Sequence, residues 1–143
     1  MAITSAICNS FKQEILEAEH NFTASTGDTF NLALYDSDAV LSKSTTAYTT
    51  SEELATTGGY TAKGKALTSV TPVLDSDTAV CDFANTSWTS ASFTARGCLI
   101  FNDDNSHTSV CAIDFGGDKT VTSGTFTIEF PAAAASTAII QIA

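Results

Sequence analysis

The sequence predicts a mainly β protein, an antiparallel β-sandwich of the jelly-roll or immunoglobulin-like type with one amphipathic α-helix near the N-terminus. Three observations lead to this class. Apolar and polar residues alternate in several short segments, which is the period of a half-buried strand. Turn-forming Gly, Asn, Asp and Ser separate these segments at intervals typical of sandwiches. Only the segment from Ser10 to Phe22 repeats its apolar residues with a helical period.

Length and composition favour a single domain over residues 1–143, with an arm at 1–9, the helix at 10–22 and the sandwich at 28–143. A chain of 143 residues can bury a core of its own without cross-links. The net charge is −10, from 6 basic and 16 acidic residues. Nucleic-acid binding needs Lys and Arg to neutralise phosphates, so we expect no nucleic-acid partner. No apolar run has the length of a membrane span or a secretory signal, so we expect no membrane partner either.

The helix is expected to begin after Ser10, a suitable N-cap, with an apolar stripe of Phe11, Ile15, Ala18 and Phe22. A helix of this length is marginal alone in water, so the stripe must be buried, either on the chain's own sandwich or on a neighbouring subunit. We favour a helix that packs on the sandwich and positions the N-terminal residues at the contact with a neighbour or the virion. The arm before it is apolar as well, and we expect it to become ordered on contact with a neighbour. The expected assembly interface consists of Ile3, Ile7, Phe11, Ile15 and Phe22.

Strands are expected from residue 29 onward, beginning with the alternation that runs from Thr29 to Leu34. Gly116, Gly117 and Asp118 are predicted to form a tight turn, in which glycine supplies a positive φ. Further strands are expected at 65–73, 80–83 and 91–101, on each side of the segment "GGDKTVTSG", and at 138–142.

Residue types that catalyse reactions or bind metals are sparse. His20 and His107 have no Cys or carboxylate spacing that matches a zinc site, and we expect both to be solvated or to cap a helix or turn. The chain has no phosphate-binding glycine loop, nucleophile elbow or dinucleotide motif. Asp103 and Asp104 could ligate calcium, but a polar hairpin turn explains them more simply. We therefore expect no enzymatic activity, no cofactor and no bound metal.

The four cysteines leave two interpretations open. Cys98 and Cys111 flank the turn "NDDNSH" on strands that should pair, which puts a disulfide between them within reach. The favoured alternative is that the cysteines are free thiols that serve as small buried hydrophobic residues. Trp88 and the three tyrosines could offer a sugar-stacking platform, but core packing is the favoured role for them as well.

Six segments of the chain, in their order, resemble a family of small virion structural proteins of tailed bacteriophages, cyanophages among them. The resemblance covers almost the whole chain. It implies a protein that is made in the cytoplasm of a bacterial host and located in the virion, and it carries over no catalytic residue. The segments are "CNSFKQEILEAEHNF", "GDTFNLALYDSDA", "TTAYTTSEELATTGGYTAKGKALTSVTP", "FTARGCLIFN", "AIDFGGDKTVTSGTFTIEFP" and "AIIQIA".

Two functions compete within this resemblance. The first is a capsid decoration or cement protein that bridges neighbouring major capsid subunits as a homo-oligomer, with a trimer favoured. The second is a structural component of the tail, neck or fibre base, whose partners would be tail proteins. A carbohydrate-binding module is a more distant alternative.

Overall fold

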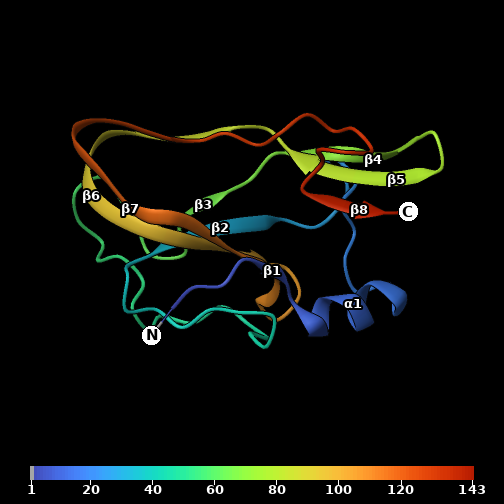
Figure 1. The fold of residues 1–143 in the computed structure, drawn as a ribbon, viewed down its shortest axis with the longest axis horizontal. Helices are drawn as coiled ribbons and strands as arrows, with labels where there is room; N and C mark the ends of the chain where they lie inside the picture. Colours follow the sequence, from blue (N-terminus) through green and yellow to red (C-terminus); the bar gives the residue numbers. More distant parts are fainter. Residues whose placement is uncertain (1) are drawn as a thin grey trace.

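The computed structural model, which describes residues 2–143, contains two antiparallel sheets and one short helix (Figure 1). The larger sheet has the order β1-β7-β6-β2-β3, and the smaller one has the order β4-β5-β8. The expected mainly β, antiparallel sandwich with one N-terminal helix is confirmed. Among the described residues, no helix has the length and apolarity to cross a membrane. The elements are β1 (Ala6–Ile7), α1 (Asn9–Leu16), β2 (Phe30–Tyr35), β3 (Lys65–Ala66), β4 (Ser69–Asp75), β5 (Thr78–Phe83), β6 (Thr86–Asn102), β7 (Thr108–Ile128) and β8 (Ile140–Ile142).

The hairpin of β6 and β7 joins the two layers, because both strands bend from the lower layer of Figure 1 into the upper one. Four register shifts interrupt their pairing, and such bulges let a paired strand bend. The expectation of two strands separated by "GGDKTVTSG" is wrong. Pairing continues through this segment, with Lys119 opposite Ala95 and Val121 opposite Phe93. Gly116 does have a positive φ of 80°, but it lies inside β7.

Strand β2 is buried on both faces, although its alternating pattern is that of a half-buried strand. Leu32 and Leu34 point into the central core between the sheets. Ala33 and Tyr35 point to the other side, where a second core cluster includes Ile3 and residues of the long segment 36–64. This segment covers the lower face of the five-stranded sheet (Figure 1).

Glu53 fixes this covering segment to the sheet. One oxygen of its carboxylate accepts a hydrogen bond from the Tyr48 hydroxyl at 2.5 Å. The other accepts from the Tyr60 hydroxyl and the Lys63 amide, both at 2.7 Å. The Tyr60 oxygen in turn accepts from the Leu34 amide of β2 at 3.0 Å. Burial, together with hydrogen bonding to Glu53, raises the pKa of Tyr48 and of Tyr60, so both hydroxyls remain donors.

Helix α1 is shorter than expected and ends at Leu16 rather than at residue 22. The chain leaves the helix at Ala18, whose φ is 61°. Its N-cap is Cys8 in place of the expected Ser10, and the Cys8 side chain makes no capping hydrogen bond. Phe22 still reaches the core, where its ring stacks on Phe30 with centroids 4.2 Å apart. The apolar stripe therefore continues past the helix as irregular chain.

We predict that Gly64→Ala lowers the stability of the protein by more than about 1 kcal/mol. Gly64 has a φ of 68°, and a Cβ there would lie 1.8 Å from the Leu32 carbonyl oxygen. Gly117→Ala is the control, because a Cβ at that position meets no atom within 4 Å. Urea unfolding of both variants checks the prediction, which fails if the two variants are equally stable.

Candidate functional site

The residues expected to form an assembly interface are mostly buried within the chain itself. Ile3, Phe11 and Phe22 are only 4–6% exposed, so their assignment to a free interface is wrong. They lie in the two core clusters, which cover them with other parts of the same chain. Ile7 and Ile15 are half-buried and line a groove at the surface.

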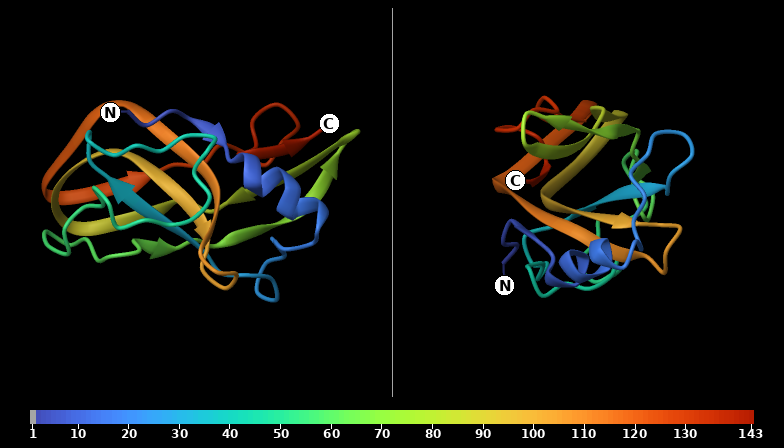
Figure 2. Two further views of the ribbon diagram at one scale, coloured as in Figure 1. Left: turned by 90° about the horizontal axis from the view of Figure 1, so that it is seen from below. Right: turned by 90° about the vertical axis from the view of Figure 1, so that its right-hand side faces the viewer.

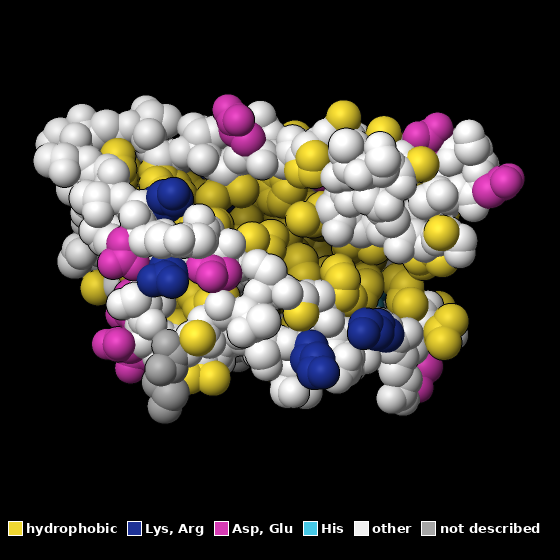
Figure 3. Space-filling model, in the orientation of Figure 1, with side chains coloured by type: hydrophobic (Ala, Val, Ile, Leu, Met, Phe, Trp, Pro, Cys, Tyr) yellow, Lys and Arg dark blue, Asp and Glu magenta, His cyan; other side chains and the backbone are white. Residues whose placement is uncertain are grey.

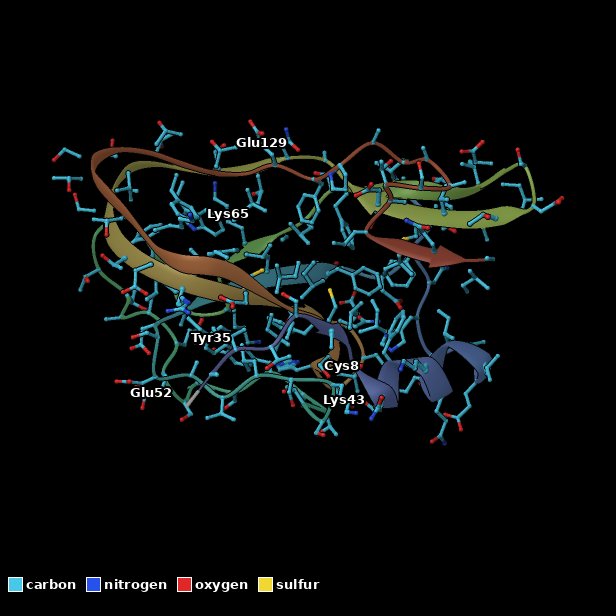
Figure 4. The ribbon with its side chains drawn as sticks, in the orientation of Figure 1. Cys8, Tyr35, Lys43, Glu52, Lys65 and Glu129 are labelled. Atoms are coloured by element: carbon cyan, nitrogen blue, oxygen red, sulfur yellow. The ribbon has the colours of Figure 1, made fainter. Side chains whose placement is uncertain are left out.

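The arm at residues 1–9 is also tied to the chain's own sheet, as far as the structure describes it. The Thr4 amide donates to the Leu41 carbonyl at 2.8 Å, and the Cys8 amide donates to the Val110 carbonyl at 2.9 Å. Figure 4 shows Cys8 where the arm enters α1. The expectation of an arm that becomes ordered only on contact with a neighbour is wrong for these residues, because β1 already pairs with β7. Met1 lies outside the described residues.

The main surface feature is an apolar opening between the two layers of the sandwich. In Figure 3 apolar side chains line the hollow between the upper and lower layers. A cavity of about 600 Å³ beside β7 forms one part of the opening. Ile139 lines this cavity and also the groove beside α1, so the two parts are adjacent. The large apolar residues that line the β7 cavity include Ile113, Phe115, Val121, Phe126, Ile128 and Phe130, and Lys119, Glu129 and three threonines line it as well.

The second part is a groove of about 440 Å³ between α1 and the three-stranded sheet, which we call the helix groove. Its walls include Ile7 and Ile15 on one side and Ile140 and Ile142 of β8 on the other. Lys12 is the single charged residue among those that line it. The right-hand view of Figure 2 looks at this end of the molecule, with the β4–β5 hairpin above and α1 below.

Large apolar side chains are exposed at the same end. Leu16 ends α1 with 88% of its surface exposed, and Leu74 at the end of β4 is 75% exposed. Cross-strand pairing puts Leu74, Ala79 and Ile142 in one row across the small sheet. Because Ala79 and Ile142 line the helix groove, this row continues its apolar wall.

His20 is buried, so the expectation of a solvated or capping imidazole is wrong for it. Its Nδ1 lies 3.0 Å from the Asn102 side-chain nitrogen, which can only donate, so the Nε2–H points toward Glu14 at 3.3 Å. Its ring also lies among the Phe11, Phe22 and Phe30 rings. His20 thus connects the chain that follows α1 to the end of β6.

The acidic side chains considered as calcium ligands are engaged in the turn between β6 and β7. Asp103 accepts from the Lys63 ammonium at 3.2 Å, and Asp104 accepts from the Thr29 amide. A different group brings carboxylate oxygens together, since those of Asp36, Asp38 and Glu52 lie within 4.8 Å of one another. Glu52 projects from the lower side of the molecule (Figure 4), and surface acids of this kind cluster commonly without a cation.

The aromatic residues considered as a sugar-stacking platform are largely internal. Trp88, Tyr35 and Tyr60 are at most 2% exposed. Their rings pack within the two core clusters, so they offer no stacking surface to a sugar.

All four cysteines are free and buried in the structure, which agrees with the favoured interpretation. Cys98 lies opposite Ile113, and Cys111 lies opposite Ile100, so the two cysteines of the considered disulfide are not direct cross-strand partners. Burial raises the pKa of Cys81 and Cys111 to about 12, and the pKa of Cys98 is raised as well.

We predict that the native protein resists thiol reagents until it unfolds. The thiolate is the reactive form, and both burial and the raised pKa values suppress it. Labelling with a chromogenic disulfide reagent should proceed at the rate of global unfolding, and all four thiols should react in urea. Rapid labelling of one cysteine in the native state would contradict the prediction, as would a lower melting temperature in reductant.

Asp82 is a buried carboxylate on β5, with 1% of its surface exposed. One oxygen accepts from the Phe83 amide at 2.9 Å, whereas Oδ2 has no hydrogen-bond partner among the described residues. Burial raises the pKa of Asp82 above its ordinary value of 3.8, and the hydrogen bond from the Phe83 amide offsets part of this rise. The folded chain therefore holds this proton to a higher pH than the unfolded chain does.

We predict that Asp82 makes the wild type less stable as the pH rises above 3.8. Asp82→Asn should not show this part of the pH dependence. In that window the folded state binds more protons at Asp82 than the unfolded state does, so the free energy of unfolding falls as the pH increases. Urea unfolding from about pH 4 to about pH 7, compared between the two proteins, isolates this contribution. Glu17→Gln, at an exposed position directly after α1, is the control. Equal pH profiles for wild type and Asp82→Asn would refute the prediction.

Comparisons with protein-family models, with curated protein sequences and with solved structures give no match to this chain. The apolar opening is therefore interpreted from its own geometry and from the resemblance noted in the sequence.

Proposed function

We propose that this chain is a structural protein of a tailed-phage particle, and most specifically a capsid decoration protein that bridges neighbouring major capsid subunits as a homo-oligomer. The apolar opening between the layers carries this proposal. Contiguous apolar surface on a soluble domain marks a site of protein contact, since leaving it in water is costly. On this proposal the protein works by surface complementarity and turns over no substrate.

The particle contact is assigned to the β7 cavity. Beyond the two residues that pair with β1, the outer edge of β7 has no neighbouring strand in the described structure. An apolar segment of a capsid subunit could insert side chains among Ile113, Val121 and Ile128 while it lies along this edge. Free sheet edges with apolar side chains favour such strand addition.

The alternative functions use the surface differently. A tail, neck or fibre-base component could use the same opening on a tail protein and would differ in copy number. The carbohydrate-binding alternative has lost its main support, because Trp88, Tyr35 and Tyr60 are buried.

We expect Val121→Asp to abolish binding to capsids that lack this protein, because a carboxylate would be buried against the apolar partner. Val121 is partly buried and lines the β7 cavity. Val40→Asp is the matched control, since Val40 is 61% exposed and lies outside the opening. Co-sedimentation with purified capsids measures binding, and gel densitometry gives the copy number per particle.

Circular dichroism and thermal unfolding show whether Val121→Asp folds, and Val121→Ser is a milder second variant. Full capsid occupancy by folded Val121→Asp would reject the β7 cavity as the contact. Binding to isolated tails, with few copies per particle, would favour the tail component over the decoration protein.

A further inference from the structure

We infer that the helix groove is a self-association site, which accepts the tip of the β4–β5 hairpin from a second copy of this chain. The inference deepens the proposed function, because it names the surface at which copies of the decoration protein join. It concerns a different part of the opening from the β7 cavity. It is therefore testable on the purified chain without any particle.

The groove requires an apolar occupant. Its walls are mainly Ile, Phe, Ala, Val and Cys, and Ile142 on one wall remains 58% exposed. Leu16, the last residue of α1, is almost fully exposed. The chain's own elements therefore leave this end of the sandwich incompletely covered, whereas Phe11 and Phe22 at its base are buried.

The hairpin tip supplies apolar side chains that lack a partner of their own. Val73 and Leu74 are 52% and 75% exposed at the end of β4. Asp75 separates them from the two-residue turn at Ser76 and Asp77, which projects beyond the rest of the small sheet (Figure 1). In a second copy, Leu74 is thus presented at the extremity of the molecule, where it can enter a groove.

Charge favours a copy of this chain as the occupant. Lys12 is the groove's single charged residue, and its ammonium has one hydrogen bond in the described structure, to the Asn9 side chain at 3.3 Å. Among residues 2–143, no carboxylate lies within salt-bridge distance of it. The hairpin tip carries the complementary charge, because Asp77 is exposed and follows Leu74 by three residues. With 16 acidic residues and 6 basic ones, the protein has few cations to offer an acidic partner, and one of them lies here.

The positions of the hairpin tip and of the helix groove allow a closed assembly. Hairpin tip and helix groove both lie at the end of the molecule viewed in the right-hand panel of Figure 2. When copies meet at this end around a symmetry axis, each tip can enter the groove of the next copy and no groove remains empty. A trimer contains three such contacts and a dimer contains two. The same pair of surfaces can therefore close an assembly of either size.

Sedimentation analysis of the purified wild type and of charge-exchange variants tests the inference. The wild type should form a discrete dimer or trimer, and Leu74→Asp should convert it to monomer. Lys12→Asp and Asp77→Lys should each weaken association by roughly tenfold or more, because each puts like charges together. The double variant Lys12→Asp with Asp77→Lys should restore association, because the pair is re-formed with the charges exchanged. Val40→Asp is the matched control and should leave association unchanged.

Several results would overturn the inference. One is a wild type that stays monomeric up to about 1 mM, the range in which only the weakest contacts form. A second is an oligomer that persists in Leu74→Asp. A third is a double charge-exchange variant that associates no better than the single variants. Circular dichroism verifies folding, and Leu74→Ser is a second variant at the same exposed position. A monomeric wild type whose capsid binding is lost with Leu74→Asp would assign the groove to a particle protein, and the decoration role would then stand without the homo-oligomer.

Discussion

The pairing of β6 with β7 is the constraint on which the rest of the structure depends. Both strands run through the two layers, so their hydrogen bonds hold the five-stranded sheet and the upper layer together (Figure 1). The register shifts give the pair its bend, and the bend closes one end of the sandwich. At the other end only the small sheet and α1 face each other, and that end remains open. The position of the opening is thus a consequence of how this hairpin bends.

The five-stranded sheet is stabilised from both sides. Its inner face shares the central core with the small sheet, and its outer face is covered by the segment 36–64. Glu53 keeps that segment in place, since two tyrosine hydroxyls and the Lys63 amide donate to its carboxylate. Hydrogen bonds to a charged acceptor are stronger than those between neutral groups, and they hold the cover without a disulfide. The covered five-stranded sheet can therefore be rigid, while the end formed by α1 and the small sheet exposes apolar walls.

The two parts of the opening suit two different contacts. The β7 cavity lies along a strand edge and can accept an extended segment, whereas the helix groove lies beside exposed Leu74 and contains Lys12. A protein that joins to its own copies through one part and to a particle through the other would have both apolar surfaces covered after assembly. The proposed structural role thus gives a reason for both apolar surfaces that the fold leaves uncovered.

The sequence by itself determined the fold class, the helix start to within two residues, the approximate positions of β2 and β5, and the internal location of the cysteines. These features follow from local periodicity and from the small apolar character of the cysteine side chain. Ile7 and Ile15 of the candidate site were recognised as well, because they belong to apolar stretches near the N-terminus.

Only the tertiary structure decided which apolar residues remain uncovered. Ile3 and Ile15 have the same character in the sequence, but Ile3 is covered by the distant segment 36–64 and Ile15 borders a groove. Residues remote in the chain likewise decide three other features. These are the continuity of β7 through Gly116, the burial of His20 and the unpartnered oxygen of Asp82. Periodicity records the alternation of neighbours along one segment, whereas burial depends on which other segment packs against it.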